Sequence, residues 1–299
     1  MRKLNGLTDR LWFAALLLLS GCNGRPVGAG YPDAQWFPRS TKGGFEQGRH
    51  GKKIDLIVIY TTEHTADRIK KLWRESEGKS GHYVVTKDGD VWQFLRDSDA
   101  GWHAGNMDYN LRSIAIAAEG FADPKNPENT TTNAGWQSAA ELKSIAQLIT
   151  WLCAQYQVPV DRAHIIGKNQ VPGVATDQFP KSGPQYWGGA SNKSSPGAYW
   201  NWTKLMESLG RKPIYRSVVV MTNCFITTLP ETNAPIISAV SAGKQLEAYD
   251  RYGGYCLVMA TDTCVPQPYI EPGRYHWDGW LAKKYVREIA FTNHETGAQ

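Results

Sequence analysis

The chain has 299 residues, of which 41% are hydrophobic, an ordinary fraction for a soluble globular protein. Its length allows two domains, or one domain with an appendage. The formal net charge of +5 is too small to indicate nucleic-acid binding and suits a neutral or modestly anionic ligand.

Residues 1–22 are predicted to direct export. A basic start precedes the apolar run LWFAALLLL, which is too short to span a bilayer as a permanent helix and is typical of a secretory signal. The tetrapeptide Leu19-Ser20-Gly21-Cys22 resembles the lipobox of bacterial lipoproteins, whose cysteine is lipidated and becomes the mature N-terminus. We therefore expect a lipid on Cys22 and a periplasm-facing protein anchored to a membrane. Asn23 favours the outer membrane; the alternatives are an ordinary signal peptide or a short anchor.

The other four cysteines would then lie in a compartment that permits disulfides. Cys256 and Cys264 are close in sequence and form the preferred bridge. Cys153 falls on the apolar face of a predicted helix, where a free buried thiol is the alternative. For Cys224 the sequence indicates no partner.

Residues 23–50 are rich in glycine, proline and polar residues, a composition that predicts an extended tether. Within it, Trp36 and Phe37 are expected to dock onto the domain that follows.

Residues 51–211 alternate between strand and helix patterns. Residues 65–77 and 138–156 each place apolar side chains on one helical face, and Ser138 with Glu141 predicts a capping box. The dipeptide Asp88-Gly89 between two β-rich runs predicts a hairpin. Strands are expected in IDLIVIY, GHYVVTKDG, DVWQFL, RSIAIAAEG and AHIIGK. These elements predict an α/β domain in which helices pack on a sheet.

Residues 212–288 change to short β-rich runs separated by turn residues, which predicts a small all-β barrel-like domain. The run GKQLEAYDRYGGYCLVM followed by DGWLAKKYVR resembles a bacterial Src-homology-3-like domain. That resemblance implies cell-wall peptide binding or targeting; the alternative is a structural appendage. Residues 289–299 are expected to form a polar tail.

Six blocks between residues 36 and 209 resemble the zinc-dependent N-acetylmuramoyl-L-alanine amidases, a family that includes peptidoglycan recognition proteins. They are IDLIVIYTTEHT, SGHYVVTKDGDVWQFL, AGWHAGN, RSIAIAAEG, AHIIGKNQVP and SPGAYWNWTKLM. The resemblance implies a mixed central sheet flanked by helices, with a groove that binds the glycan and peptide stem of peptidoglycan. In active members, three protein ligands hold a zinc ion that activates water to cleave the amide between muramic acid and L-alanine.

At the positions where the family has zinc ligands, this sequence has Tyr60, Lys168 and Ser195, with Asp177 as an alternative for the third. An ammonium about 4 Å from a divalent cation is repelled by roughly 8 kcal/mol at an effective dielectric near 20. Tyrosine must lose a proton with an ordinary pKa near 10 before it coordinates well. We therefore expect no zinc, and we assign no catalytic residue. Ala117 stands where active relatives often have a carboxylate, and Lys193 is a candidate for the position of the family's catalytic basic residue.

The resemblance also implies residues that line the groove. Contact roles are expected for His82, Tyr83, Trp102, His103, Asn106 and Asn110, with core packing or structural hydrogen bonding as the alternative.

Three functions remain open at this point. The first is a non-catalytic lipoprotein that binds peptidoglycan or muropeptides. The second is a working amidase, which would need zinc held by an unexpected ligand set. The third is an envelope assembly protein that contacts a protein partner, whose identity the sequence does not indicate.

Overall fold

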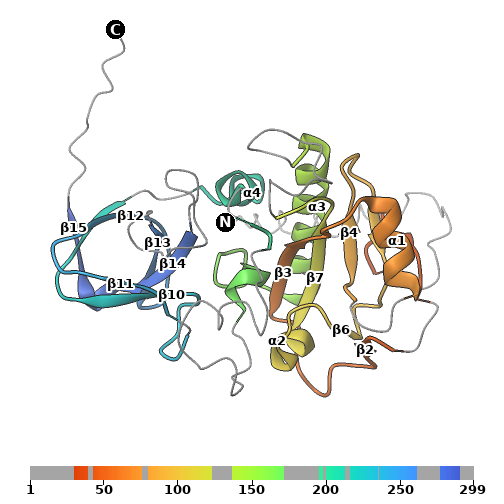
Figure 1. Cartoon of the computed structure of the whole chain (residues 1–299), viewed down its shortest axis with the longest axis horizontal. Helices are drawn as coiled ribbons and strands as arrows, with labels where there is room; N and C mark the ends of the chain where they lie inside the picture. The colour runs from red at the N-terminus through yellow and green to blue at the C-terminus, as the bar shows by residue number, and fades with distance from the viewer. Residues whose placement is uncertain are drawn as a thin grey trace, which may run out of the picture.

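The computed structural model describes residues 30–39, 43–75, 80–122, 137–171, 195–197, 200–212, 216–234, 236–260 and 277–289. Two large sheets lie side by side, and α4 (Trp202–Ser208) lies between them (Figure 1). Cys22, Asp177, Lys193 and Cys264 fall outside the described residues.

The first sheet has six strands in the order β1-β5-β4-β7-β3-β8. Its neighbours are parallel except for β4 and β5, which form the predicted antiparallel hairpin around Gly89. The strands are β1 (Gln35–Trp36), β3 (Leu56–Thr61), β4 (Tyr83–Val85), β5 (Val91–Gln93), β7 (Ser113–Ala118) and β8 (Ile165–Gly167). The expected mixed sheet is confirmed. All residues of β3 and β7 are buried because both faces of the sheet are covered.

Helices cover the two faces of this sheet. On one face, α3 (Ala139–Tyr156) packs Leu148 and Ile149 against Ile57 of β3. On the other face, α1 (Ala66–Glu75) contributes Trp73 to a cluster with Tyr60. Both predicted helices are confirmed, and short helix α2 (Met107–Arg112) precedes β7.

The capping box at the start of α3 is only half formed. Ser138 Oγ accepts the backbone N–H of Glu141 at 2.9 Å, as predicted. The Glu141 carboxylate instead accepts from Lys87 Nζ at 3.1 Å.

The predicted tether is wrong for the described part of residues 30–50, which packs on the domain. Strand β1 pairs with β5, and β2 (Phe45–Glu46) pairs with β6 (Ala100–Gly101). Phe37 docks as expected, with its ring 5.6 Å from that of Trp92. These few side-chain and backbone contacts hold a segment whose glycine-rich composition alone favours an extended chain.

The second sheet has seven strands in the order β11-β10-β14-β13-β12-β9-β15, and all its pairs are antiparallel. The strands are β9 (Arg216–Val220), β10 (Cys224–Thr227), β11 (Ile236–Val240), β12 (Gln245–Tyr252), β13 (Tyr255–Ala260), β14 (Trp277–Ala282) and β15 (Val286–Ile289), with a 3₁₀ turn η3 (Lys283–Tyr285). Their core includes Val218, Ile226 and Leu281. A C-terminal β region is therefore confirmed, whereas its likeness to a Src-homology-3 barrel stays a prediction.

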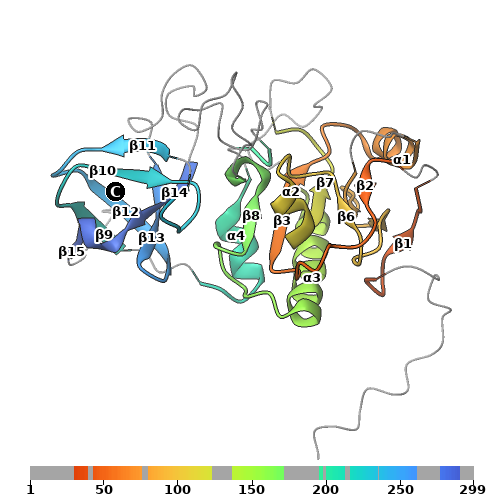
Figure 2. The ribbon, with the colours of Figure 1, turned by 90° about the horizontal axis from the view of Figure 1, so that it is seen from below.

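The two sheets are joined through buried contacts. Ala163, just before β8, packs with Tyr249, Leu257 and Trp280 of the second sheet. Gln170, in the 3₁₀ turn η1 (Lys168–Gln170), donates to the carbonyl oxygen of Thr228 at 3.2 Å. Figure 2 shows β8 and α4 on the side of the first sheet that faces the second.

Cys153, Cys224 and Cys256 are free, buried thiols. Cys256 Sγ donates to Leu281 O at 3.4 Å, so the expected bridge from Cys256 to Cys264, which lies outside the described residues, is not formed in this structure. No helix in the described part of the chain has both the length and the apolar composition needed to cross a membrane.

Candidate functional site

Tyr60 lies near the end of β3, on the sheet face opposite α3. Its ring is stacked between Trp73 and His103, with centroid distances of 6.3 Å to each. A Cβ at position 81 would lie 2.2 Å from the Tyr60 hydroxyl, so only glycine there leaves room for this tyrosine. The hydroxyl has no hydrogen-bond partner among the described residues. Burial raises the pKa of Tyr60 far above its ordinary value, so the phenol is neutral.

Lys168 begins η1, directly after β8. Because β3 and β8 are parallel neighbours, their carboxyl ends meet at one edge of the sheet. The Lys168 ammonium lies 4.9 Å from the centre of the Tyr60 ring, within the range of a cation–π interaction. Tyr60 and Lys168, two of the three residues at the family's zinc-ligand positions, therefore lie close together.

Ser195 reaches the same edge from a different segment. Its Oγ accepts the Thr61 N–H at 2.6 Å and lies 2.7 Å from Thr61 Oγ1, and its carbonyl oxygen accepts the N–H of Asn169 at 2.8 Å. Thr61 Oγ1 donates to Glu63 Oε1, so the Ser195 hydroxyl donates to Thr61. A chain of two hydroxyls and one carboxylate therefore fixes Ser195.

The residues present do not fit a zinc ion. The Tyr60 phenol is protonated, Lys168 presents a positive charge, and the Ser195 hydroxyl is held by Thr61. Ala117 pairs directly with Tyr60 in the sheet, so no carboxylate stands beside it there. Within the described ranges, no three His, Cys, Asp or Glu side chains are grouped to hold a metal ion.

His82 and Tyr83 have structural roles, which corrects the contact roles expected for them. Neither is exposed. His82 Nδ1 accepts the N–H of Ala115 at 3.1 Å and Nε2 donates to Asp99 O at 3.0 Å. Burial, assisted by nearby Arg49, lowers the pKa of His82 to about 3. Tyr83 donates to the buried Asp97 carboxylate at 2.8 Å.

His103 and Asn110 are also interior residues and cannot contact a ligand in this conformation. His103 Nδ1 donates to Gly101 O at 2.9 Å, and Nε2 lies 2.8 Å from Ser113 Oγ. Burial, followed by the charges of His82 and Lys168, lowers the pKa of His103 well below its usual range. Asn110 Oδ1 accepts from the backbone N–H groups of His103 and Ala104, which fixes the turn after Trp102.

Trp102 and Asn106 remain accessible. Trp102 is 38% exposed, and its indole N–H donates to Glu46 at 3.1 Å, which holds the ring at the surface. Asn106 is half-buried and caps α2 by accepting the N–H of Asp108. A ligand-contact role for these two residues stays a prediction.

Sequence reasoning did not identify Thr61, Glu63, Trp73 and Gly81 as parts of this site. Trp73 carried a signal, since it falls on the apolar face of the helix predicted over 65–77. Gly81 and Glu63 carried none, because their roles depend on contacts across the fold.

Residues 50–198 match the family model described as N-acetylmuramoyl-L-alanine amidase. Over 180 residues the chain is 27% identical to "N-acetylmuramoyl-L-alanine amidase A" of Achromobacter lyticus, a match that covers 58% of this chain and 91% of that protein.

Solved structures of amidases are also similar to this chain, at low identity. A selenomethionine derivative of AmpD is 16% identical with a TM-score of 0.43, and the match covers 60% of this chain and 95% of AmpD. The amidase LysC of Clostridium intestinale is 16% identical with a TM-score of 0.41, over 60% of this chain and 99% of LysC. AmiD of E. coli, in complex with a muropeptide substrate, is 18% identical with a TM-score of 0.41, over 60% of this chain and 63% of AmiD.

Proposed function

From the premise that residues 50–198 form a domain of the N-acetylmuramoyl-L-alanine amidase family, we propose that the protein binds peptidoglycan or muropeptides without hydrolysing them. Membership of this family indicates peptidoglycan as the class of ligand. The side chains at the site are unsuited to bind the zinc ion on which hydrolysis in the family depends.

One observation carries this proposal. Tyr60, Lys168 and Ser195 come from three segments far apart in sequence and meet at one edge of the sheet, where the resemblance expects zinc ligands. Their spatial agreement supports the alignment with the family, while their chemistry opposes metal binding. A positive charge at the site favours an anionic group of the ligand, such as a stem-peptide carboxylate.

The location of the protein and the role of its second sheet are part of the proposal. Export with a lipid on Cys22 would place the binding domain beside the cell wall, facing the periplasm. The C-terminal β region, as a Src-homology-3-like domain, would add a second contact with the wall.

The decisive experiment compares zinc content and amidase activity of the wild type with those of a Tyr60→His, Lys168→His, Ser195→Asp variant. We expect the wild type to sediment with insoluble sacculi, to carry little zinc and to release no stem peptide. The variant should gain zinc, because imidazole and carboxylate are zinc ligands at neutral pH. Close to one zinc per wild-type chain together with peptide release would instead establish an active amidase.

The binding claim has its own variant, so that it does not depend on the folding of the triple change. Trp102→Ala removes the most exposed of the predicted contact rings and should weaken muropeptide binding by about 5- to 10-fold. Met107→Ala, which removes another exposed apolar side chain nearby, serves as the control and should change nothing. Failure of the wild type to sediment with sacculi would favour the assembly-protein alternative.

A further inference from the structure

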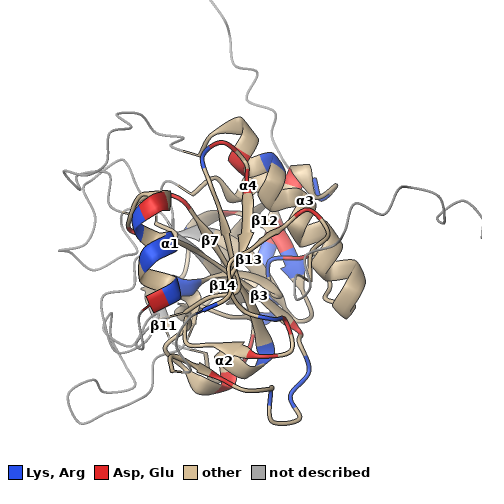
Figure 3. Ribbon diagram, turned by 90° about the vertical axis from the view of Figure 1, so that its right-hand side faces the viewer, with Lys and Arg blue, Asp and Glu red and all other residues tan. Residues whose placement is uncertain are grey.

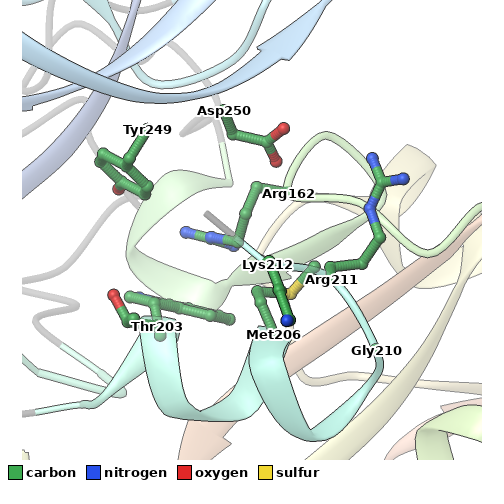
Figure 4. A pocket seen from close by; sticks show the side chains of 9 residues that line it. Arg162, Thr203, Met206, Gly210, Arg211, Lys212, Tyr249 and Asp250 are labelled. Atoms are coloured by element: carbon green, nitrogen blue, oxygen red, sulfur yellow. The ribbon is translucent and has the colours of Figure 1, made fainter. Parts of the chain in front are cut away.

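A cleft of about 160 Å³ lies where α4 and the residues after it face β12 of the second sheet (Figure 4). Arg162, Trp202 and Arg211 line it from the first domain, Lys212 from the junction that follows, and Tyr249 and Asp250 from the second domain. It does not include Tyr60 or Lys168 and is therefore distinct from the site described above.

The wall of the cleft is built around a fixed cation. Arg162 is 1% exposed, and its guanidinium carbon lies 3.4 Å from the centre of the Trp202 ring. Its two terminal nitrogens donate to Ile165 O and to Gln170 Oε1. Because these contacts hold the guanidinium group of Arg162 on several sides, its positive charge has a fixed position in the wall of the cleft.

The charges around the cleft are unbalanced. Of the described residues that line it, Arg162, Arg211 and Lys212 are cationic and Asp250 is anionic. Asp250 Oδ1 already accepts the N–H of Arg251 at 2.8 Å. Figure 3 shows basic and acidic residues interspersed along α1, where the basic residues also outnumber Asp67 and Glu75, so a positive excess is not confined to the cleft. A small anion is the ligand that such a surface attracts.

Size and composition narrow the kind of anion. A cavity near 150 Å³ accommodates one molecule about as large as benzene, which corresponds to the end of a peptide and not to a chain. Trp202, Met206 and Tyr249 supply apolar surface beside the cations, which suits an aliphatic side chain next to a carboxylate.

We propose that this cleft between the two domains binds the terminal carboxylate of a short peptide. Arg211 and Lys212 face the carboxylate, and Trp202 and Met206 contact the side chain of the last residue. The identification of the peptide with a peptidoglycan stem peptide rests on the proposed function. The proposal that the cleft binds a carboxylate does not.

Calorimetric titration of the full chain tests this with three probes: N-acetyl-D-alanine, its primary amide, and inorganic phosphate. The acid should bind, its affinity should fall as sodium chloride is added, and the amide should bind at least about ten-fold more weakly. The Arg211→Ala, Lys212→Ala double variant should weaken binding of the acid about ten-fold or more. Both side chains are exposed, so we expect the fold to survive.

Two further variants test whether binding of the acid depends on the sign of the charges and on their position in the cleft. Asp250→Asn keeps the oxygen that accepts from Arg251 but removes the negative charge, and it should tighten binding of the acid about two- to five-fold. Lys284→Ala, Arg287→Ala removes an exposed lysine and arginine outside the cleft and should leave binding unchanged.

The proposal would be overturned if the acid and the amide bound with equal affinity, or if the Arg211→Ala, Lys212→Ala variant bound the acid as tightly as the wild type. If phosphate bound as tightly as the acid, the assignment of a peptide as the ligand would be overturned. Sedimentation with sacculi is scored separately. If the wild type does not sediment but binds the acid, the proposed function fails and the cleft stands.

Discussion

Glu141 has a carboxyl group that is fully buried at the start of α3. One oxygen accepts from Lys87 Nζ at 3.1 Å, and the other has no hydrogen-bond partner among the described residues. Burial raises the pKa of Glu141 from 4.5 to about 7, against the smaller opposing effect of Lys87. The folded protein therefore retains a proton that the unfolded chain has lost between about pH 4.5 and pH 7, so Glu141 lowers stability as the pH rises through this window.

Replacing this carboxyl group by an amide should remove the pH dependence that it causes. We expect Glu141→Gln to raise the free energy of unfolding by about 1–3 kcal/mol at pH 8 and to have little effect at pH 4.5. Urea denaturation at the two pH values measures this. The exposed Glu207→Gln on α4 is the control, and a Glu141→Gln effect equal at both pH values would contradict the argument.

The residues predicted from the sequence to contact a ligand differ in whether they are exposed in the structure. Trp102 and His103 are adjacent, yet the first is exposed and the second is 3% exposed. His103 is buried against the rings of Tyr60 and His82, at centroid distances of 6.3 Å and 5.9 Å, and these residues of β3 and of the segment before β4 reach it only after the sheet has formed. The type of a residue indicates that it can bind a sugar or peptide, but its access depends on such distant partners.

Among the elements, the turn η1 connects the candidate site to the second sheet through Gln170. Its Oε1 accepts from Gly167 N and from Arg162 Nη2, each at 2.9 Å, and its Nε2 donates to Thr228 O. Gln170→Ala leaves these buried groups without that partner and should lower the free energy of unfolding by about 2–4 kcal/mol. Chemical denaturation measures it, with the exposed Gln147→Ala on α3 as the control. A loss no larger than that of the control would show that η1 does not depend on Gln170.

Elements with strong local patterns were predictable, and those fixed by distant partners were not. Strands β3 and β7 are continuous apolar runs, and α3 has a helical period, so each follows from its own residues. Strand β1 has two residues and exists because it pairs with β5, more than fifty residues later. The candidate site was partly predictable. The strand pattern alone located Tyr60 at the end of a strand, but only the family resemblance indicated that Lys168 and Ser195 lie near it.

At the scale of the whole molecule, the second sheet is bound to the first and does not hang from a free linker. The connection between β10 and β11 inserts Leu229 and Ala234 against Leu56 and Val58 of β3. These two β3 residues share a sheet face with Tyr60, because side chains alternate along a strand. The C-terminal region therefore covers part of the face that carries the candidate site, and its loss would expose apolar surface there.

This arrangement predicts that damage on the C-terminal side is felt in the first domain. Leu229 is 4% exposed, and Leu229→Ala should lower the free energy of unfolding by about 2–4 kcal/mol because a cavity opens against β3. Amide hydrogen exchange should become faster in β3 and β8 as well as in β10, since the shared cluster includes Ile166 of β8. Phe225→Ala, which truncates a side chain on β10 that is 54% exposed, should have an effect within about 0.5 kcal/mol. Faster exchange confined to the seven-stranded sheet would mean that the two sheets are stable independently, and the second sheet would then have no part in shaping the site.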